Sequence, residues 1–348
     1  MNPILAAVLF ALVKIAVIVL GYVMLFATVL TWLERKYSAV LQDRIGPHRA
    51  EIGGMRLGGL FHMIADPIKV LFKEDFMPRT ENPWMYKFAP WLSVVPPMVI
   101  FAVIPFGPGD ACVISNGPLG MLFIFAVAAL GVYGSVFGAW ASNSKFSLLG
   151  GLRATAQMIS YEVSLGLNLV GIFMIYQSVS LQGIIDAQGG EILGFLPAWG
   201  IVLQPASFIL FLASAVAENK RAPFDLTEAE SELVAGYFTE YSSMKFALFS
   251  LGEFIEIIAI GCIGSCMFLG GWQIPWVDAG EGGFTVLTFL QIGCFLTKVF
   301  VLVWLQMTIR WTLPRFRYDQ LMRLGWVYIL PLSLVNILLT GIGLYIFK

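Results

Sequence analysis

Long apolar runs separated by short polar segments dominate the pattern of this chain. Runs of about 20 residues lie at residues 4–33, 88–106, 119–140, 154–177, 200–218, 243–270, 285–309 and 326–347. A helix of about 20 apolar residues is long enough to cross the hydrocarbon layer of a bilayer. The pattern therefore predicts an all-α polytopic membrane protein with eight transmembrane helices, forming one membrane domain over residues 1–348. The first run lacks a basic start and is too long for a signal peptide, so we expect it to be an uncleaved helix.

The distribution of lysine and arginine predicts the orientation. Segments 34–88, 141–153, 219–245 and 310–325 hold 18 of the 21 basic residues, whereas segments 107–118, 178–199 and 271–284 hold none. Because basic loops stay on the cytoplasmic side, both termini are expected on the outer, periplasmic side. Composition agrees with a membrane protein, since 58% of the residues are hydrophobic and the mean hydropathy is +0.82. The net charge of −1 argues against nucleic acid as a partner.

The first basic segment, 34–88, is the longest cytoplasmic loop. Gly46 and Pro47 predict a turn, and Pro67 is expected to interrupt the helix that follows or to start a second one. Apolar residues recur at helical spacing on one face of that helix, at Leu57, Leu60, Phe61, Ile64, Ile68, Leu71 and Phe72. This amphipathic helix could lie in the membrane interface with solvated charges. Alternatively, Arg35, Arg44 and Arg49 could surround a polar ligand head, and the pattern leaves both interpretations open.

The segment 219–243 is acidic and follows the fifth apolar run. Carboxylates crowd into it and the residue before it, at Glu218, Asp225, Glu228, Glu230, Glu232 and Glu240. Pro223 is expected to stop the preceding helix, and Thr227 with Glu230 predicts a capping box that starts an amphipathic surface helix. Leu233, Val234, Tyr237 and Tyr241 would share the apolar face of that helix. Carboxylates concentrated at a membrane boundary indicate proton handling, because a carboxylate changes charge when its surroundings change.

Three further acids lie inside apolar runs: Glu162, Glu253 and Glu256. Each costs about 2.5–3.5 kcal/mol at the bilayer centre, so each needs water, a partner or a proton. Glu253 and Glu256 are one turn apart, where mutual repulsion would favour protonation of one of them. Lys14 and Lys298, inside other runs, are possible counter-charges, although Lys14 could also reach the interface.

Residues that hold redox cofactors or metals are scarce. His48 and His62 both fall in segment 34–88, so two helices cannot share a membrane haem through them. The cysteines lack the C-x-x-C spacing of an iron–sulfur or zinc site, and Cys262 with Cys266 is interpreted as small residues packing on one helix face. No glycine-rich nucleotide fingerprint follows a strand. We therefore expect no metal site and no redox cofactor, and any electrons would be carried by a partner.

Several motifs in order indicate a family. They are Trp-Leu-Glu-Arg-Lys at 32–36 with Arg-Ile-Gly-Pro at 44–47, Ala-Asp-Pro-Ile-Lys at 65–69 with Phe-Lys-Glu-Asp at 72–75, and the block from 217 to 241 that contains Ala-Pro-Phe-Asp-Leu at 222–226. Over nearly its whole length the chain resembles the quinone-site membrane subunit of proton-pumping NADH:quinone oxidoreductase, respiratory complex I. His48 replaces the Asn expected after Gly-Pro, and Asn219-Lys220 differs from the commoner Thr-Asn, so the resemblance is weaker in the loops.

The resemblance implies a function and site residues. Subunits of this family anchor the peripheral arm and form much of a narrow chamber for ubiquinone or menaquinone, which a terminal iron–sulfur cluster in a neighbouring subunit reduces. Positions implied for the chamber and its loop are Glu34, Arg35, Arg44, Gly46, Pro47, Arg49, Asp66 and Lys69, with Phe224 and Phe238 as weaker candidates. Positions implied for the proton path are Glu162, Glu218, Glu228, Glu230, Glu232 and Glu253, supported by Asp225, Glu240 and Glu256.

The resemblance also implies partners and a location. FMN and iron–sulfur clusters would belong to other subunits, and the partners would be peripheral-arm, small membrane and antiporter-like subunits together with lipid and quinone. A bacterial inner membrane fits better than an organelle. Two alternatives remain at this point: the equivalent subunit of a membrane-bound hydrogenase, formate hydrogenlyase or ferredoxin- or F420-linked dehydrogenase, and a stand-alone proton-coupled transporter.

Overall fold

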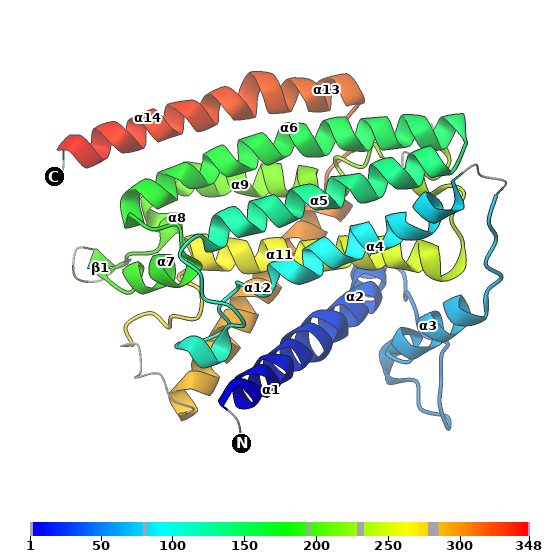
Figure 1. The fold of residues 1–348 in the computed structure, drawn as a ribbon, viewed down its shortest axis with the longest axis horizontal. Helices are drawn as coiled ribbons and strands as arrows, with labels where there is room; N and C mark the ends of the chain where they lie inside the picture. Colours follow the sequence, from blue (N-terminus) through cyan, green and yellow to red (C-terminus); the bar gives the residue numbers. More distant parts are fainter. Residues whose placement is uncertain are drawn as a thin grey trace.

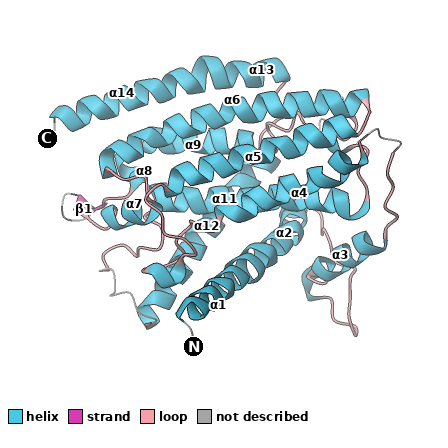
Figure 2. Cartoon of the chain, in the orientation of Figure 1, coloured by secondary structure: helices cyan, strands magenta, loops and turns pink. Residues whose placement is uncertain are grey.

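The structure is a computed structural model that describes residues 3–78, 82–192, 194, 196–227, 233–277 and 285–346. Its described part is almost entirely helical, as Figure 2 shows. The longer helices are α1 (Pro3–Ile15), α2 (Leu25–Leu41), α3 (His62–Phe72), α4 (Pro83–Ile100), α5 (Gly120–Ala141), α6 (Lys145–Tyr176), α9 (Pro205–Glu218), α11 (Ser243–Phe268), α12 (Val286–Thr312) and α14 (Leu330–Ile346). The predicted all-α membrane class is therefore confirmed.

Short elements join these helices. The π-helical segments η1 (Ala16–Met24) and η5 (Leu324–Ile329) continue α1 into α2 and α13 (Tyr318–Arg323) into α14. Other short pieces are α7 (Leu181–Ala187), α8 (Gly200–Leu203) and the 3₁₀ turns η2 (Leu57–Gly59), η3 (Asp110–Cys112) and η4 (Gly236–Phe238). The strands β1 (Glu191–Ile192) and β2 (Leu196–Pro197) pair antiparallel, with Glu191 opposite Pro197.

Six helices in the described part are long and apolar enough to cross a membrane: Val8–Leu41, Gly120–Ala141, Lys145–Tyr176, Ser243–Phe268, Val286–Thr312 and Tyr318–Ile346. They coincide with six of the eight predicted runs. The run 200–218 becomes α8 and the shorter apolar helix α9, and the run 88–106 becomes α4. Helix α4 ends at Ile100, six residues before the predicted end, and Phe101–Val103 form a turn ahead of Pro105. A proline disfavours helical conformation in the residue before it, so Ile104 cannot carry the helix on to the predicted end.

The helices α4, α5, α6, α9 and α11 pack side by side and form the centre of the molecule (Figure 1). Close approach to α4 depends on glycine in both of its neighbours. A Cβ on Gly134 of α5 would lie 2.8 Å from the backbone nitrogen of Ser93, and a Cβ on Gly252 of α11 would lie 2.6 Å from the Ser93 carbonyl oxygen. Small residues at such crossings let membrane helices approach closely enough for tight packing.

The outer helices show the pattern expected of a lipid-facing surface. The first long helix and α14 flank the central group, and side chains such as Leu20 and Leu338 are exposed on them. Figure 1 shows both chain termini on the side of the molecule away from α3. This agrees with termini on one face of the membrane, while the number of spans and their orientation stay predictions.

Three local predictions are wrong. Helix α2 continues to Leu41 rather than ending near residue 34, so Glu34 and Arg35 lie within it. Pro67 lies inside α3 without interrupting it. One proline removes one backbone hydrogen bond, and α3 tolerates that loss near its exposed middle. Helix α9 ends at Glu218, because Lys220 adopts a left-handed conformation (φ +56°) well before Pro223 is reached.

The acidic segment 219–243 is only partly described. The predicted helix after Thr227 begins in residues 228–232, which lie outside the described residues. Leu233 is helical, and between it and α11 the described chain forms the 3₁₀ turn η4. Leu233, Tyr237 and Tyr241 are buried as predicted, but Val234 is exposed and has a positive φ of 68°, so the predicted apolar face does not include it.

Candidate functional site

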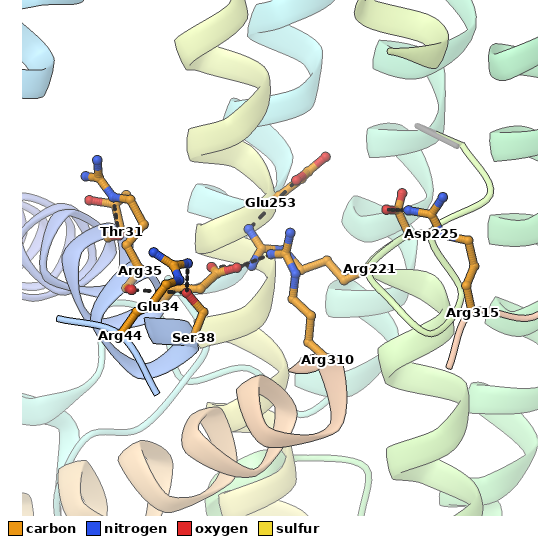
Figure 3. Close-up of polar contacts among 10 residues, drawn as sticks. All are labelled: Thr31, Glu34, Arg35, Ser38, Arg44, Arg221, Asp225, Glu253, Arg310 and Arg315. Atoms are coloured by element: carbon orange, nitrogen blue, oxygen red, sulfur yellow. Dashed lines mark hydrogen bonds and ion pairs between the residues drawn. The ribbon is translucent and has the colours of Figure 1, made fainter. Parts of the chain in front are cut away.

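A cluster of buried charges lies where α2, α11 and α12 meet the chain after α9. Helix α2 supplies Glu34, α11 supplies Glu253 and the last turn of α12 supplies Arg310. Arg221 comes from the turn that follows α9. Figure 3 shows the guanidinium groups of Arg221 and Arg310 converging on the Glu34 carboxylate.

The hydrogen bonds in this cluster join acids and bases directly. Arg221 Nη1 donates to Glu34 Oε2 at 2.7 Å, and Arg310 Nη1 donates to Glu34 Oε1. Arg221 Nη2 also lies 3.8 Å from Glu253 Oε2, and the other oxygen of Glu253 accepts a 3.2 Å bond from the Tyr237 hydroxyl. Two carboxylates thus face two guanidinium groups, and the cluster is close to neutral. Glu34, Arg221 and Glu253 are 6, 9 and 7% exposed, so these pairs have little access to water.

Because the cluster is buried, its stability depends on each of its charged residues. Removing one partner of a buried ion pair costs about 3–5 kcal/mol, because the other charge stays buried without compensation. Arg221 also lies 4.4 Å from the ring centre of Phe254, where a cation is attracted to the aromatic face. We refer to Glu34, Glu253, Arg221 and Arg310 as the paired cluster.

A second group of acids lies around a cavity between α4, α5, α6, α9 and α11. Glu218 and Glu256 line this cavity together with Asn219, and the other walls are apolar. Glu162 and Glu256 are near enough to repel a charge on Glu218. The side chain of Glu256 has one buried oxygen, Oε2, with no hydrogen-bond partner among the described residues. We refer to Glu162, Glu218 and Glu256 as the cavity acids.

This cavity has room for water. About 50 Å³ of it is open to water-sized molecules, and one water needs roughly 10–15 Å³. Lys220 is buried, and its ammonium attracts both Glu218 and Glu256. No ion pair to the cavity acids is formed within the described part of the chain. The cavity acids therefore lack the direct ion pairs that hold the acids of the paired cluster.

The residues implied for the chamber and its loop, apart from the two phenylalanines, lie on α2, on α3 and on the loop between them. Arg35 Nη2 forms an ion pair with Asp66 Oδ2, which joins α2 to α3. Arg44 donates to Gln42 and Ser38 of the same stretch, at 2.8 and 3.5 Å. Arg49 and Lys69 are exposed and form no hydrogen bond or ion pair with the described residues. Gly46 has a φ of +70°, and a Cβ there would lie 2.7 Å from that of Ala39, so only glycine fits this turn.

The two phenylalanines implied as quinone contacts are buried in aromatic packing. Phe224 stacks on Phe316 with ring centres 5.3 Å apart, and Phe238 lies edge-on to Tyr237 at 4.7 Å. Asp225 accepts a 2.9 Å bond from Arg315, and the Glu240 carbonyl accepts a 2.7 Å bond from Tyr86. The supporting role of Asp225 and Glu240 in a proton path stays a prediction.

Three of the implied path residues, Glu228, Glu230 and Glu232, lie outside the described residues. Glu253 and Glu256, predicted to repel each other at one helical turn, do so, but they belong to different groups. Glu253 faces Arg221 in the paired cluster, whereas Glu256 faces the cavity. Glu162 belongs to the cavity group through its effect on Glu218.

The predicted counter-charges are wrong. Lys14 donates to the backbone carbonyls of Asp110 and Val113, and Lys298 donates to those of Leu269, Gly271 and Gln273. Both lysines therefore bind loop carbonyls at the ends of helices. Carbonyl groups without a partner at helix ends carry negative partial charge, which explains why the two lysines bind them.

Sequence reasoning missed the cations that do face the acids: Lys220, Arg221, Arg310 and Arg315. They lie at the ends of apolar runs, where a basic residue is expected for topology alone. One signal was available in the sequence. The acids inside the apolar runs need compensating cations, and no arginine lies inside those runs, so the cations had to come from the ends of the runs.

These features define a class: a polytopic helical membrane protein with a buried ion cluster beside a group of protonatable acids. Comparison with known proteins then gives the family. The family model described as NADH dehydrogenase matches residues 13–341. The chain belongs to this NADH dehydrogenase family of membrane proteins.

Individual relatives agree with the family model over nearly the full length. The chain is 44% identical to an H subunit of NADH-quinone oxidoreductase from Geobacter metallireducens, with 98% of both chains covered. It is 45% identical to an H subunit of the same enzyme from Geobacter sulfurreducens over 92% of each chain. It is also 42% identical to the corresponding protein of Rhizobium meliloti, covering 93% of this chain and 94% of the relative.

Proposed function

We propose that this chain is a membrane subunit of a proton-translocating NADH:quinone oxidoreductase, in which it forms part of the quinone chamber and couples quinone reduction to proton movement. Family membership over almost the whole chain supports the first part. The relatives at 42–45% identity are all named as subunits of the NADH-linked enzyme, which favours it over a hydrogenase or formate hydrogenlyase. A subunit of a large complex is also a better explanation than a stand-alone transporter.

The quinone chamber would be formed at α2, α3 and the loop between them. Support comes from the Arg35–Asp66 pair, which joins α3 to α2. The face of α3 that carries Ile64, Ile68 and Leu71 is exposed, so an isoprenoid tail or a partner subunit could cover it. The exposed cations of this region, Arg49 and Lys69, could attract the quinone head or the acidic surface of a peripheral-arm subunit.

The electrons would come from partner subunits. A terminal iron–sulfur cluster in the peripheral arm would reduce the quinone, and FMN would be held there too. The residues of this chain would bind and orient the quinone, exclude water and supply or accept protons. Small membrane subunits and antiporter-like subunits would receive the signal.

Coupling would begin with a change of charge in the chamber. Reduction places negative charge on the quinone, and a unit charge about 10 Å away changes the energy of another by about 1.7 kcal/mol at an effective dielectric constant of about 20. That is more than one pKa unit. The acids Glu228, Glu230 and Glu232 would respond first, and protons would then pass through Glu218 toward Glu162 and Glu253.

The observation that carries this proposal is the cavity lined by Glu218 and Glu256. It holds acids that form no direct ion pair with the described residues, next to a cluster whose acids are all paired. A proton path needs groups that can change charge, and the cavity acids are such groups.

Replacing Glu162 by Gln in the assembled complex tests the path. The amide keeps the volume but cannot carry a proton, so assembly should persist while NADH-driven quinone reduction and proton pumping fall. Glu51→Gln is the matched control, because Glu51 is an exposed acid paired with Arg56. Unchanged turnover and pumping in Glu162→Gln would exclude this route.

A tagged chain purified gently from its native membrane tests the assignment itself. Inhibitor-sensitive NADH:quinone activity in a large complex is expected. A complex that ignores NADH but accepts another donor would point to a hydrogenase-type relative, and a chain that purifies alone would revive the transporter. The bacterial origin of the relatives supports an inner-membrane location. A C-terminal alkaline phosphatase fusion should be active if that end lies in the periplasm.

A further inference from the structure

Lys220 is a buried charge that the proposed mechanism does not use. It lies in the turn that follows α9, next to Arg221, and it is 3% exposed. Its Nζ forms no hydrogen bond and no ion pair within the part of the chain that the structure describes. An ammonium group has three donors and no acceptor, and burying it without partners is costly. This lysine therefore needs an explanation.

The turn that holds this lysine is fixed on both sides. Asn219 Nδ2 donates to Gln306 Oε1 of α12 at 3.3 Å, and Arg221 Nη1 donates to Glu34 Oε2 at 2.7 Å. Lys220 itself has a φ of +56°, a left-handed conformation that glycine and asparagine adopt at a lower cost than lysine. Backbone preference therefore does not account for a lysine at this position, and the reason must lie in its side chain.

The ammonium group lies between the paired cluster and the cavity acids. Its Nζ is 5.5 Å from the ring centre of Tyr237, whose hydroxyl donates to Glu253 of the paired cluster. On the other side the ammonium attracts Glu218 and Glu256, the two acids that line the cavity. The position next to both groups gives Lys220 influence over the charge of the cavity acids without tying it to either of them.

The other charged groups that face these two acids come from three elements. Glu162 of α6 repels Glu218, and Glu253 of α11 repels Glu256. Arg221, in the turn after α9, attracts Glu256, but less strongly than the lysine does. The residues of α4 and α5 that line the cavity carry no ionisable group. Because Arg221 is bound in the paired cluster, the lysine is the cation that balances the cavity acids within the described residues.

One ammonium group balances one carboxylate. If Glu218 and Glu256 were both ionised, one buried negative charge would have no compensation, which is unfavourable. If both were protonated, the ammonium itself would be the buried charge without compensation. The arrangement is therefore most favourable with one acid ionised and the other protonated. Water in the cavity, which has about 50 Å³ of room for it, would link these groups and give the unpaired Oε2 of Glu256 a donor.

We propose that Lys220 is a positioning residue of the proton path, whose ammonium keeps one of the two acids Glu218 and Glu256 ionised and able to accept a proton. A proton that arrives from segment 228–232 binds to the ionised carboxylate. The ammonium then favours release of a proton from the other acid toward Glu162. One proton enters and one leaves, so the charge of the cavity is restored, and the lysine keeps its own proton throughout. This inference rests on the proposed function, because it requires the path to run through the cavity.

Three substitutions separate the charge of this lysine from its other properties. Lys220→Met removes the charge and keeps most of the volume. Lys220→Asn also removes the charge, and asparagine tolerates the left-handed conformation, so the turn after α9 should form normally. Lys220→Arg keeps the charge on a group that does not lose its proton in proteins, so it preserves a fixed cation but abolishes a proton relay.

The test measures NADH-driven quinone reduction and proton pumping by the assembled complex over a range of pH. Without the ammonium the cavity carboxylates form only at higher pH. The rising, acid side of both profiles should therefore move up by about one pH unit in Lys220→Asn and Lys220→Met, as expected for the loss of one nearby charge. Lys220→Arg should keep the wild-type profile. The matched control Lys145→Met, an exposed lysine at the start of α6, should keep it too.

An unmoved profile in a neutral variant that assembles would overturn the proposal. Failure of both neutral variants to assemble would also overturn it, because the charge would then be structural. Normal assembly of Lys220→Arg without pumping would make the lysine a relay instead. Glu218→Gln, measured in parallel, tests the path itself. If that variant pumps normally, the proposed function is wrong, whereas if it stops pumping while Lys220→Asn keeps the wild-type profile, only the role of Lys220 is wrong.

Discussion

The paired cluster and the cavity acids lie next to each other, yet their carboxylates have opposite surroundings, because those of the paired cluster are in ion pairs and the cavity acids are not. In the paired cluster Glu34 accepts from Arg221 and Arg310, and Glu253 faces Arg221 and Tyr237. In the cavity group Glu256 keeps a buried oxygen without a partner among the described residues, and Glu218 faces an open cavity. Of the consecutive residues Lys220 and Arg221, Arg221 pairs with Glu34 and Glu253, whereas Lys220 attracts Glu218 and Glu256 without forming an ion pair.

This difference teaches what each group can do. An acid between two guanidinium groups stays charged through any moderate change of its surroundings, so it serves to hold helices and orient neighbours. An acid that is buried without a salt bridge has its charged and neutral forms closer in energy. It can therefore respond to a change of charge nearby.

The largest effect is expected for Arg221→Met. It leaves Glu34 and Glu253 buried without their shared cation, which costs about 3–5 kcal/mol. The amount of this chain in the assembled complex, measured by native electrophoresis, should fall sharply. Arg221→Lys keeps the charge but loses the fork that reaches both acids, so it should recover only part of the assembly. Normal assembly of Arg221→Met would show that the cluster does not hold the helices together.

Glu218→Gln should separate activity from stability. The amide relieves the cost of burying a charge, so assembly should match wild type. Loss of a proton-transferring group lowers rates by about 10²-fold or more, so NADH-driven pumping should nearly cease. Measuring both quantities on one preparation, with Glu51→Gln as control, makes the contrast with Arg221→Met direct. A variant that pumps normally would remove Glu218 from the path.

Arg35→Ala should have a moderate effect on quinone binding. The pair with Asp66 is partly exposed, and such pairs contribute only about 0–1 kcal/mol to stability. Assembly should therefore be unchanged, while the apparent KM for a short-chain quinone rises about threefold to tenfold if the guanidinium faces the chamber. Asp66→Asn should act in the same direction. An unchanged KM in both variants would show that this pair only joins α2 to α3 and does not contact the quinone.

Tyr237→Phe should have the smallest effect. It removes the 3.2 Å hydrogen bond to Glu253 but leaves the ring packing in place. The net contribution of such a bond is about 0.5–1.5 kcal/mol. A fall of about twofold in turnover with normal assembly is expected, measured beside wild type at one quinone concentration. A loss as large as that of Glu218→Gln would move Tyr237 into the proton path.

Much of the fold could be predicted because apolar runs of membrane length are a strong local signal. Six of the eight runs coincide with long apolar helices, and Cys262 with Cys266 is buried on α11 as predicted. Exact ends were less predictable. Lys220 ends α9 through its own backbone conformation and Pro67 lies inside α3, because neighbouring structure rather than local preference decides such positions.

The acids of the site could be found for a related reason. A glutamate inside an apolar run is costly and therefore conspicuous, as Glu162, Glu253 and Glu256 are. Their partners could not be found in the same way. Glu34 meets Arg221 across 187 residues and Arg310 across 276. From the sequence alone, an arginine at the end of an apolar run that faces solvent cannot be distinguished from one that reaches into the helix bundle.

The sequence by itself determined the membrane class, the main helices, the positions of the buried acids and the absence of local motifs for redox cofactors. The tertiary structure decided which acids are paired, which face a cavity, and that Lys14 and Lys298 bind loop carbonyls. The physical reason is the distance along the sequence over which each interaction acts. Hydrophobic periodicity records which face of one helix avoids water, whereas the pairing of charges depends on how several helices, distant in sequence, pack against one another.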